Sequence, residues 1–303
     1  MALGHSGPLY ILAFDHRGSY SKGVFGIEGT PSGADLDRVA DGKKLIWEGF
    51  SKAVDVGADP ANGVLVDEQF GGDVARAARS SGVTFAMPTE KSGQNEFDFE
   101  YGDDFTAHIE EFDPSFSKVL VRYNPDGDQE MNKRQAERLA RLSSWLHDND
   151  RKFLFELLVP AEPEQLEQAG GDKHTYDVEV RPDLVVRTIA ECQAAGIEAD
   201  VWKIEGLDKR EDCVRVSEQA RADGRDGVAC VVLGRGADSD AVANWLRVGA
   251  DVPGYIGFAV GRTIWMDALK GWMADELSRD EAANKIAANY SFMVETFTSA
   301  RDG

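Results

Sequence analysis

The sequence predicts a single parallel (β/α)8 barrel of the α/β class, and three observations lead to this prediction. Eight strand-like runs recur along the 303 residues, and a helical or partly helical segment follows each run. Most runs are continuously apolar, as expected when both faces of a parallel strand are buried. No linker-like stretch interrupts the repeat, so we expect residues 1–303 to form one domain. A doubly wound open sheet is disfavoured, because no G-x-G-x-x-G motif follows the first strand and no P-loop motif occurs.

The first four units follow one another between residues 9 and 147. Their predicted strands are LYILAFD (9–15), GVLVDE (63–68), VTFAMP (83–88) and SKVLVRY (117–123). A glycine-rich loop follows the first strand, and a long loop follows the third. Helices are expected over 33–56, 72–80, 104–111 and 133–147, the last of them capped near Asn132.

The last four units occupy the remainder of the chain. Their predicted strands are KFLFELLV (152–159), DVWKIEG (200–206), GVACVVLGRG (227–236) and GYIGFAVG (254–261). An irregular acidic connection follows the first of these and leads to a helix over 182–195, whose first turn suits Pro182. The other helices are expected over 211–222, 238–248, the segment RTIWMDALKGWMADE, and 280–298.

Composition excludes several classes of partner. The formal net charge is −21, and binding to nucleic acid or to an anionic membrane requires a basic face. No apolar run approaches the roughly 18–20 residues that span a membrane, and the N-terminus lacks the pattern of a secretory signal. The three cysteines, Cys192, Cys213 and Cys230, fit neither a disulfide framework nor a C-x-x-C metal site. We therefore expect a cytoplasmic protein.

Charged residues gather where the predicted strands end, which is where barrels of this kind build their active sites. In strand order they are Asp15-His16-Arg17, Asp67-Glu68, Glu90-Lys91, Lys118 with Arg122, Glu156, Lys203 with Glu205, Arg235, and Arg262. Their accumulation at one end of the barrel is harder to explain structurally than any single ion pair.

Lys203 is the leading candidate for a catalytic residue. Strand alternation places Lys203 and Glu205 on one face and the bulky Trp202 and Ile204 on the other, so Lys203 should point into the barrel. Burial disfavours the charged form of an amine, and a neutral amine attacks carbonyl carbon. The simpler interpretation is a lysine whose ammonium reaches water at the strand end. Glu156, on the neighbouring strand, is then either a structural ion-pair partner or an acid–base group.

The last two strand-to-helix loops predict a phosphate site. Each combines glycine with arginine at a helix start, where backbone N–H groups and a guanidinium can hold an anion. The candidates are Gly234, Arg235, Gly261 and Arg262, although two ordinary glycine-containing turns would look the same. A metal site has weak support, because Asp67, Glu68, Glu90 and Glu156 are possible ligands but the histidines lack metal-ligand spacing.

Taken in order, several segments match a known family. They are AFDHRG, VDEQFG, EKSG, SKVLVRY, FLFELLVP, DVWKIEG, LGRGAD and GFAVGRTIW. They resemble class I aldolases of the tagatose-bisphosphate aldolase type, over nearly the whole chain. The sequence looks most like the aldolase-like domain fused behind the sugar kinase in some bacterial inositol-catabolism proteins. The resemblance implies a metal-independent, cofactor-free (β/α)8 aldolase that acts on phosphorylated ketoses.

The resemblance also implies roles for individual residues. Lys203 matches the Schiff-base lysine, Glu156 and Lys118 match the polar residues of the fifth and fourth strands, and Asp15 matches the first-strand aspartate. Gly261 and Arg262 match the phosphate-binding turn. The remaining candidates for contact with substrate are Arg17, His16, Lys91, Gly234 and Arg235. Two of them depart from the family pattern: His16 replaces a common glutamine, and Arg235 stands where relatives often have a small residue.

The function expected from these features is C–C cleavage of a phosphorylated sugar to a dihydroxyacetone-phosphate-type product and an aldehyde. The favoured substrate is 2-deoxy-5-keto-gluconate 6-phosphate. Tagatose or fructose bisphosphate and sulfofructose phosphate remain alternatives, as do a non-catalytic sugar-phosphate-binding barrel and a metal-dependent lyase or isomerase. Barrels of this type often form homo-oligomers, but no surface patch in the sequence specifies how.

Overall fold

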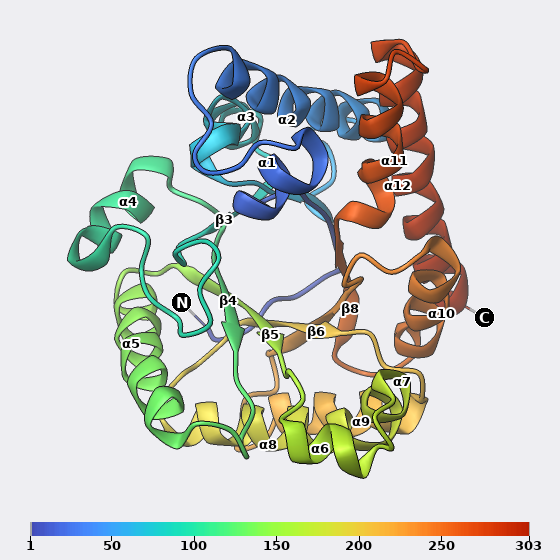
Figure 1. The fold of residues 1–303 in the computed structure, drawn as a ribbon. Coiled ribbons are helices and arrows are strands. Elements are labelled where there is room, and N and C mark those ends of the chain that lie inside the picture. Colours follow the sequence, from blue (N-terminus) through green and yellow to red (C-terminus); the bar gives the residue numbers. More distant parts are fainter. Residues whose placement is uncertain (1, 303) are drawn as a thin grey trace.

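In the computed structural model, which describes residues 2–302, eight parallel strands close into a barrel in the order β1 to β8 (Figure 1). The predicted fold class is therefore confirmed. The strands are β1 Leu9–Ala13, β2 Asn62–Leu65, β3 Thr84–Pro88, β4 Phe116–Arg122, β5 Lys152–Leu158, β6 Val201–Glu205, β7 Ala229–Leu233 and β8 Tyr255–Val260. Each lies within one or two residues of the predicted run, except that the predictions for β2 and β7 extend further into the loops.

Helices surround the barrel on its outer face (Figure 1). The longer ones are α2 Ala34–Ala53, α3 Glu68–Ser81, α5 Gln129–Asp148, α8 Arg181–Ala194, α9 Arg210–Ala220, α10 Ser239–Ala250, α11 Arg262–Met273 and α12 Arg279–Asp302, with the shorter α4 Phe105–Phe112. Within residues 2–302, none of the helices is both long and apolar enough to span a membrane.

Helix α5 shows how side-chain capping sets an element boundary. The cap predicted near Asn132 is wrong: α5 begins earlier, because the Asp128 carboxylate accepts the Met131 amide at 3.0 Å. Asn132 is instead buried inside the helix and donates its side-chain amide to the Asn124 carbonyl at 2.7 Å. Asp67 likewise caps α3 by accepting the Phe70 amide, which places the start of that helix at Glu68.

Several short helices lie in segments for which the sequence predicts only loop. The glycine-rich loop after β1 contains α1 Gly18–Phe25, and the 3₁₀ turn η1 Gly102–Asp104 precedes α4. The acidic connection after β5 contains α6 Pro163–Gln168, α7 Lys173–Thr175 and the π-helix η2 Tyr176–Val180. Their few residues carry too little apolar periodicity to be recognised.

Alternation along the strands produces two apolar layers. Inside the barrel lie small and branched residues, among them Ile11, Leu154 and Val231. Between strands and helices lies the larger layer, which includes Phe155 and Trp202, with ring centroids 4.7 Å apart. Trp202 and Ile204 belong to this outer layer, so the predicted inward direction of Lys203 is correct.

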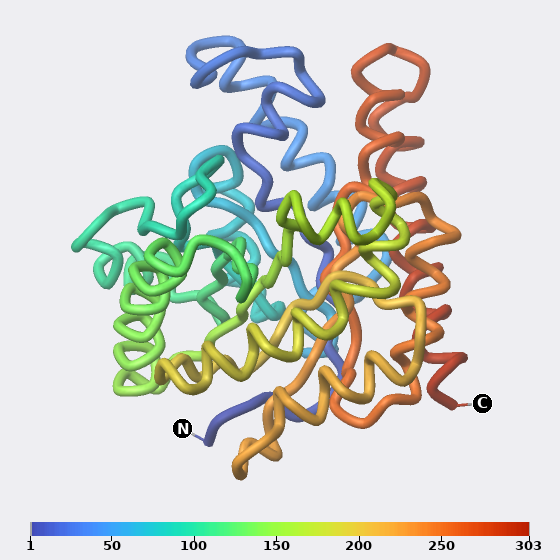
Figure 2. The backbone as a smooth tube through the Cα atoms, turned by 60° about the horizontal axis from the view of Figure 1, so that its bottom comes forward, coloured from blue at the N-terminus to red at the C-terminus, as the bar shows by residue number. Residues whose placement is uncertain are grey.

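The N-terminal segment covers the amino end of the barrel. It runs beneath the strands in Figure 2, where the Gly4 amide donates to the buried Asp200 carboxylate at 2.8 Å. Lys152 joins the same carboxylate at 2.8 Å and also donates to the Gly4 carbonyl. The His5 ring packs edge-on against the inner-layer Phe116 at 5.4 Å. These contacts cover the amino end of the barrel, opposite the strand ends at which the site is predicted.

Candidate active site

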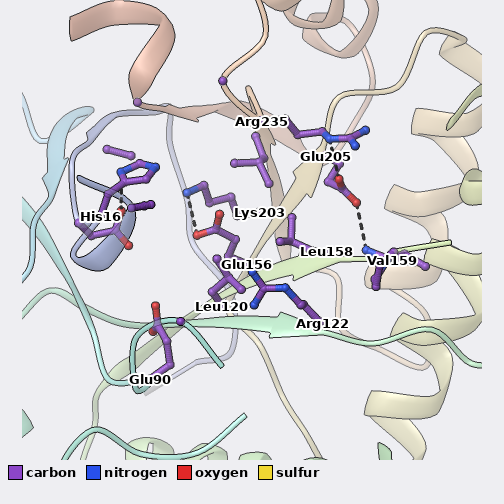
Figure 3. Close-up of a pocket in the computed structure, with 18 of the residues that line it drawn as sticks. His16, Glu90, Leu120, Arg122, Glu156, Leu158, Val159, Lys203, Glu205 and Arg235 are labelled. Carbon is purple, nitrogen blue, oxygen red and sulfur yellow. Dashed lines mark hydrogen bonds and ion pairs between the residues drawn. The ribbon is translucent and has the colours of Figure 1, made fainter. Parts of the chain in front are cut away.

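A cavity of about 790 Å³ lies at the carboxyl ends of the strands (Figure 3). Side chains from β1, β4, β5, β6, β7 and β8 and from the loops after β1, β3, β5, β7 and β8 line it. All the predicted site residues except Gly234 belong to this lining: Asp15, His16, Arg17, Lys91, Lys118, Glu156, Lys203, Arg235, Gly261 and Arg262. The fold therefore brings together side chains that are up to 247 residues apart, as the strand-end argument requires.

Lys203 lies at the floor of this cavity and is 2% exposed. Its β6 position is in register with Glu156 of β5, and its Nζ donates to Glu156 Oε2 at 2.9 Å (Figure 3). Both side chains point inward because strand parity puts Trp202 and Phe155 in the outer layer. A buried amine thus faces a cavity with a proton acceptor at hydrogen-bond distance.

Lys118 of β4 is bound far more tightly than Lys203. Its Nζ contacts Asp15 Oδ2 at 2.7 Å, Glu90 Oε1 at 2.7 Å and Glu156 Oε2 at 3.0 Å. Burial would lower the pKa of Lys118, but the carboxylates, Asp15 first, outweigh it and raise the pKa well above its usual value. Lys118 is therefore a fixed cation, whereas Lys203 has one carboxylate partner in residues 2–302.

The surrounding carboxylates respond differently to these lysines. Burial raises the pKa of Asp15 and of Glu156, but Lys118 and Lys203 outweigh it, so both pKa values lie below the usual range. For Glu90 burial prevails over Lys118 and Arg17, and its pKa is raised. Glu156 Oε2 contacts both lysines, so Glu156 is placed to exchange a proton with Lys203 while Lys118 stays charged.

His16, at the end of β1, is a neutral group among cations. Its ring lies edge-on to Trp265 at 5.8 Å, and Nδ1 is 3.9 Å from Asp15 Oδ1. Burial is the main cause that lowers the pKa of His16, to about 4; Asp15 opposes the shift, while Lys43 and Arg262 add to it. Nδ1 has no hydrogen-bond partner within residues 2–302. A neutral imidazole that lines the cavity is suited to hydrogen bonding with a sugar hydroxyl.

Arg17 and Lys91 are both predicted to contact substrate, but they differ in whether their charged groups already have partners in the protein. Arg17 is buried, and its guanidinium is taken up by the Glu100 carboxylate at 3.0 Å and by the Glu90 carbonyl. Lys91 is exposed on the loop after β3 and forms no ion pair among residues 2–302. Arg17 thus supports the cavity wall, while Lys91 remains available to an anion.

The turn after β8 places a glycine and an arginine at the start of a helix. Gly261 is the N-cap of α11 and Arg262 its first residue. A Cβ on Gly261 would lie 2.3 Å from the Ala13 carbonyl oxygen, so glycine is needed for β8 to end against β1. The Arg262 guanidinium donates to the Arg235 carbonyl at 3.0 Å, and no carboxylate pairs with it within residues 2–302. Gly234 packs away from the cavity, against Val260.

Arg235 has a different environment from that of Arg262. Its side chain pairs with Glu205 Oε1 at 2.9 Å and with Asp177 Oδ2 at 2.8 Å. Glu205 also accepts the Val159 amide at 3.0 Å (Figure 3). The carboxylate of the K-I-E segment, Glu205, is therefore occupied by Arg235 and by the chain after β5, and it lies apart from the group around Lys203.

The cavity is cationic in a strongly acidic protein. Eight cationic and five anionic side chains line it, a net charge of +3: Arg17, Lys91, Lys118, Arg122, Lys173, Lys203, Arg235 and Arg262 against Asp15, Glu90, Glu156, Asp177 and Glu205. Arg122, which the sequence places at the end of its strand without assigning it a role toward substrate, donates to the Gln94 carbonyl at 2.9 Å and forms no ion pair within residues 2–302. Strand parity brings it into the cavity, because Lys118, Leu120 and Arg122 share one face of β4.

The carboxylates considered as metal ligands have other partners. Asp67 binds Lys43 at 2.7 Å, and Glu68 lies 3.4 Å from His108. Glu90 and Glu156 both hold Lys118. Within residues 2–302, no three His, Cys, Asp or Glu side chains are grouped so that they could hold a metal ion.

Solved structures with the same fold include aldolases. The fructose-bisphosphate aldolase of Plasmodium falciparum is 12% identical, with a TM-score of 0.69 over 98% of this chain and 92% of that one. The protein Cgl0159 of Corynebacterium glutamicum is 17% identical, with a TM-score of 0.59 over 96% and 88%. A Schiff-base-forming fructose-1,6-bisphosphate aldolase is 16% identical, with a TM-score of 0.57 over 95% and 94%. At these identities the likeness shows a shared fold.

Comparison of sequences identifies a family of unassigned function. No curated protein matches the sequence. One family model matches, and it covers residues 4–301, nearly the whole chain. The protein therefore belongs to the family described as uncharacterized proteins conserved in bacteria (DUF2090).

Proposed function

We propose that this protein is a class I aldolase that cleaves a phosphorylated ketose through a Schiff base on Lys203. The observation that carries the proposal is the pair of buried lysines at the cavity floor, Lys118 and Lys203, which share one carboxylate oxygen of Glu156. An amine nucleophile needs a base at hydrogen-bond distance and a site that excludes bulk water, and Lys203 has both. The shared fold with Schiff-base-forming aldolases supports the same chemistry.

In the proposed mechanism, Glu156 accepts a proton from the Lys203 ammonium, and the free amine adds to the substrate ketone. The carbinolamine loses water as Glu156 returns the proton to the departing hydroxyl, which leaves an iminium. Glu156, ionised again, accepts the hydroxyl proton on the aldehyde side as the C–C bond breaks, and the iminium takes up the electron pair as an enamine. Glu156 returns this proton to the enamine carbon, and hydrolysis of the resulting iminium releases the ketone product and regenerates Lys203.

Lys118 and Asp15 have supporting roles in this mechanism. Lys118 stays protonated, because Asp15, Glu90 and Glu156 surround it, and its charge keeps Glu156 ionised and ready to accept a proton. Asp15 holds Lys118 in place and lines the cavity beside His16, where both can bind substrate hydroxyls. We assign the phosphate to Arg262 and to the backbone amides near Gly261, at the N-terminus of α11.

The favoured substrate is 2-deoxy-5-keto-gluconate 6-phosphate, on the basis of the inositol-catabolism resemblance. Its phosphate and its carboxylate are at opposite ends of the sugar chain. Arg262 follows β8 and Arg122 ends β4, and these two strands face one another across the eight-stranded barrel. Arg122 and Lys91 would thus meet the end far from the phosphate. Tagatose and fructose bisphosphates and sulfofructose phosphate are the other candidate substrates.

Borohydride trapping tests the proposal. Each candidate ketose phosphate is incubated with the protein and reduced, and the adduct is located by intact-mass and peptide mass spectrometry. We expect a single adduct on Lys203, fastest with the true substrate. Adducts on Lys118 instead, or binding without any adduct, would contradict the Schiff-base assignment; the second result would point to a non-catalytic sugar-phosphate-binding barrel.

A further inference from the structure

The turn between β7 and α10 contains two consecutive residues in left-handed backbone conformation. Arg235 has φ 52° and Gly236 has φ 73°. Glycine adopts this region freely, but arginine does so only where the surroundings hold it there. The side chain of Arg235 supplies that constraint, because it is fixed at both ends of its guanidinium by Glu205 of β6 at 2.9 Å and by Asp177 of η2 at 2.8 Å.

The main chain of the same turn contacts the side chain of Arg262. The carbonyl of Arg235 accepts from Arg262 Nη2 at 3.0 Å, and the Arg262 guanidinium lies against Gly236. A Cβ on Gly236 would be 2.7 Å from Arg262 Cζ, so this contact requires the absence of a side chain. One residue further on, the Ala237 carbonyl accepts from Thr263 Oγ1 at 2.7 Å. Through these two hydrogen bonds, the turn holds the side chains of the first two residues of α11 in place.

We propose that Arg235 is a positioning residue of the phosphate site, which aims Arg262 through its own main-chain carbonyl and does not itself bind substrate. The proposal rests on the assignment of phosphate to Arg262. The Glu205 and Asp177 ion pairs hold the Arg235 backbone in the conformation that presents its carbonyl to Arg262 Nη2. The other N–H groups of Arg262 then remain free to meet an anion as a fork.

The same contacts argue against direct binding of phosphate by Arg235. To reach an anion in the cavity, its guanidinium would have to leave two carboxylates, and Glu205 would then stay buried with only the Val159 amide and the more distant Arg181 for partners. Arg181 Nη1 is 3.7 Å from Glu205, beyond hydrogen-bond distance. Arg262 has no such competing partner within residues 2–302 and is the better anion ligand.

The test measures affinity for inorganic phosphate by ³¹P nuclear magnetic resonance titration of the full chain. Arg235→Gly keeps the carbonyl and tolerates the left-handed backbone, but removes both tethers. We expect it to raise the Kd for phosphate about tenfold, the effect of loosening one charge-assisted hydrogen bond. Arg235→Lys can still reach one carboxylate and should recover most of the affinity. The matched control is Asp275→Gly, a left-handed residue (φ 57°) in the turn after α11, which should bind like the wild type.

A second readout separates positioning from a general structural role. With the trapped substrate, Arg235→Gly should raise KM and leave kcat within about twofold, since Lys203 and Glu156 are untouched. Wild-type phosphate affinity in Arg235→Gly would overturn the inference. So would a loss as complete as that in Arg262→Ala with no recovery in Arg235→Lys, which would make Arg235 a ligand.

The wild-type protein distinguishes failure of this inference from failure of the proposed function. An adduct on Lys203 with unchanged phosphate affinity in Arg235→Gly refutes the role of Arg235 alone. Absence of phosphate binding in the wild type refutes both the phosphate assignment and the role of Arg235 that depends on it. Absence of any Lys203 adduct, with phosphate affinity that still depends on Arg235, refutes the aldolase chemistry and retains the binding site.

Discussion

Replacing Lys118 by methionine should destabilise the fold strongly at neutral pH. The substitution removes the cation that contacts Asp15 and Glu90 at 2.7 Å and Glu156 at 3.0 Å, while methionine fills much of the same volume. Breaking a buried ion pair by removing one partner costs about 3–5 kcal/mol. Unfolding entropy is about 2.1 cal/mol/K per residue, so for 303 residues this cost lowers Tm by about 5–8 °C.

The effect should also depend on pH in a defined direction. In the wild type, Lys118 and Lys203 outweigh burial and hold the pKa values of Asp15 and Glu156 below their usual range. Such carboxylates contribute stability above their unfolded pKa of about 4, and this contribution is lost as the pH falls below it. Without Lys118, burial favours their protonated forms, so the variant should gain stability relative to the wild type as the pH falls from 8 to 5.

Urea denaturation at several pH values measures this difference. The matched control is Lys44→Met, which removes an exposed ion pair to Asp73 of similar length, 2.9 Å, and should leave stability unchanged. The explanation fails if Lys118→Met is no less stable than Lys44→Met at pH 8. It also fails if the difference in the free energy of unfolding between Lys118→Met and the wild type becomes larger as the pH is lowered.

Three further predictions concern the cavity. Lys203→Met should abolish both borohydride trapping and turnover, whereas Lys209→Met, which replaces an exposed lysine, should be trapped like the wild type. Mass spectrometry of the reduced protein measures the adduct. Turnover by Lys203→Met would exclude Lys203 as the nucleophile. Glu156→Gln should lower kcat about 10²–10⁴-fold, the usual contribution of acid–base catalysis, and a kcat near wild type would assign proton transfer elsewhere. Burial chiefly lowers the pKa of His16 to about 4, so wild-type stability should fall as the pH drops from 6.5 towards 4, because the unfolded chain takes up the proton first. Urea denaturation should show a smaller loss of stability over this pH range in His16→Gln than in the wild type. An equal dependence of stability on pH in the two proteins would contradict the role of His16.

The fold could be predicted because each strand carries its own signal. Apolar runs such as that of β6 mark strands buried on both faces, and parity alone determines that Lys203 points inward and Trp202 outward. The cluster of site residues follows from one further rule, that parallel strands present their carboxyl ends at the same end of a barrel. For these reasons, Lys203 and Glu156 are found in contact as neighbours on adjacent strands.

Which partner each charged group selects could not be predicted, because pairing depends on side-chain reach across the barrel. The sequence places Lys118 near several carboxylates but does not show that it takes three of them and leaves Lys203 with one. Nor does it show that Arg17 is bound to Glu100, 83 residues away on a long loop. Short helices such as α1 and α6 escape prediction because their stability comes from tertiary contacts.

The division of the cavity between strands and loops separates the reactive groups from those that surround them. Lys118, Glu156 and Lys203 are held by the hydrogen-bonded ladder of β4, β5 and β6, where inserting one residue would turn a side chain to the opposite face. Lys91 and Lys173 are on connections outside that ladder, where insertions and substitutions leave the register unchanged. A scaffold built in this way can diverge in what it recognises while its nucleophile stays in place, which makes residues 91–99 and 160–175 the natural targets for engineering new specificity.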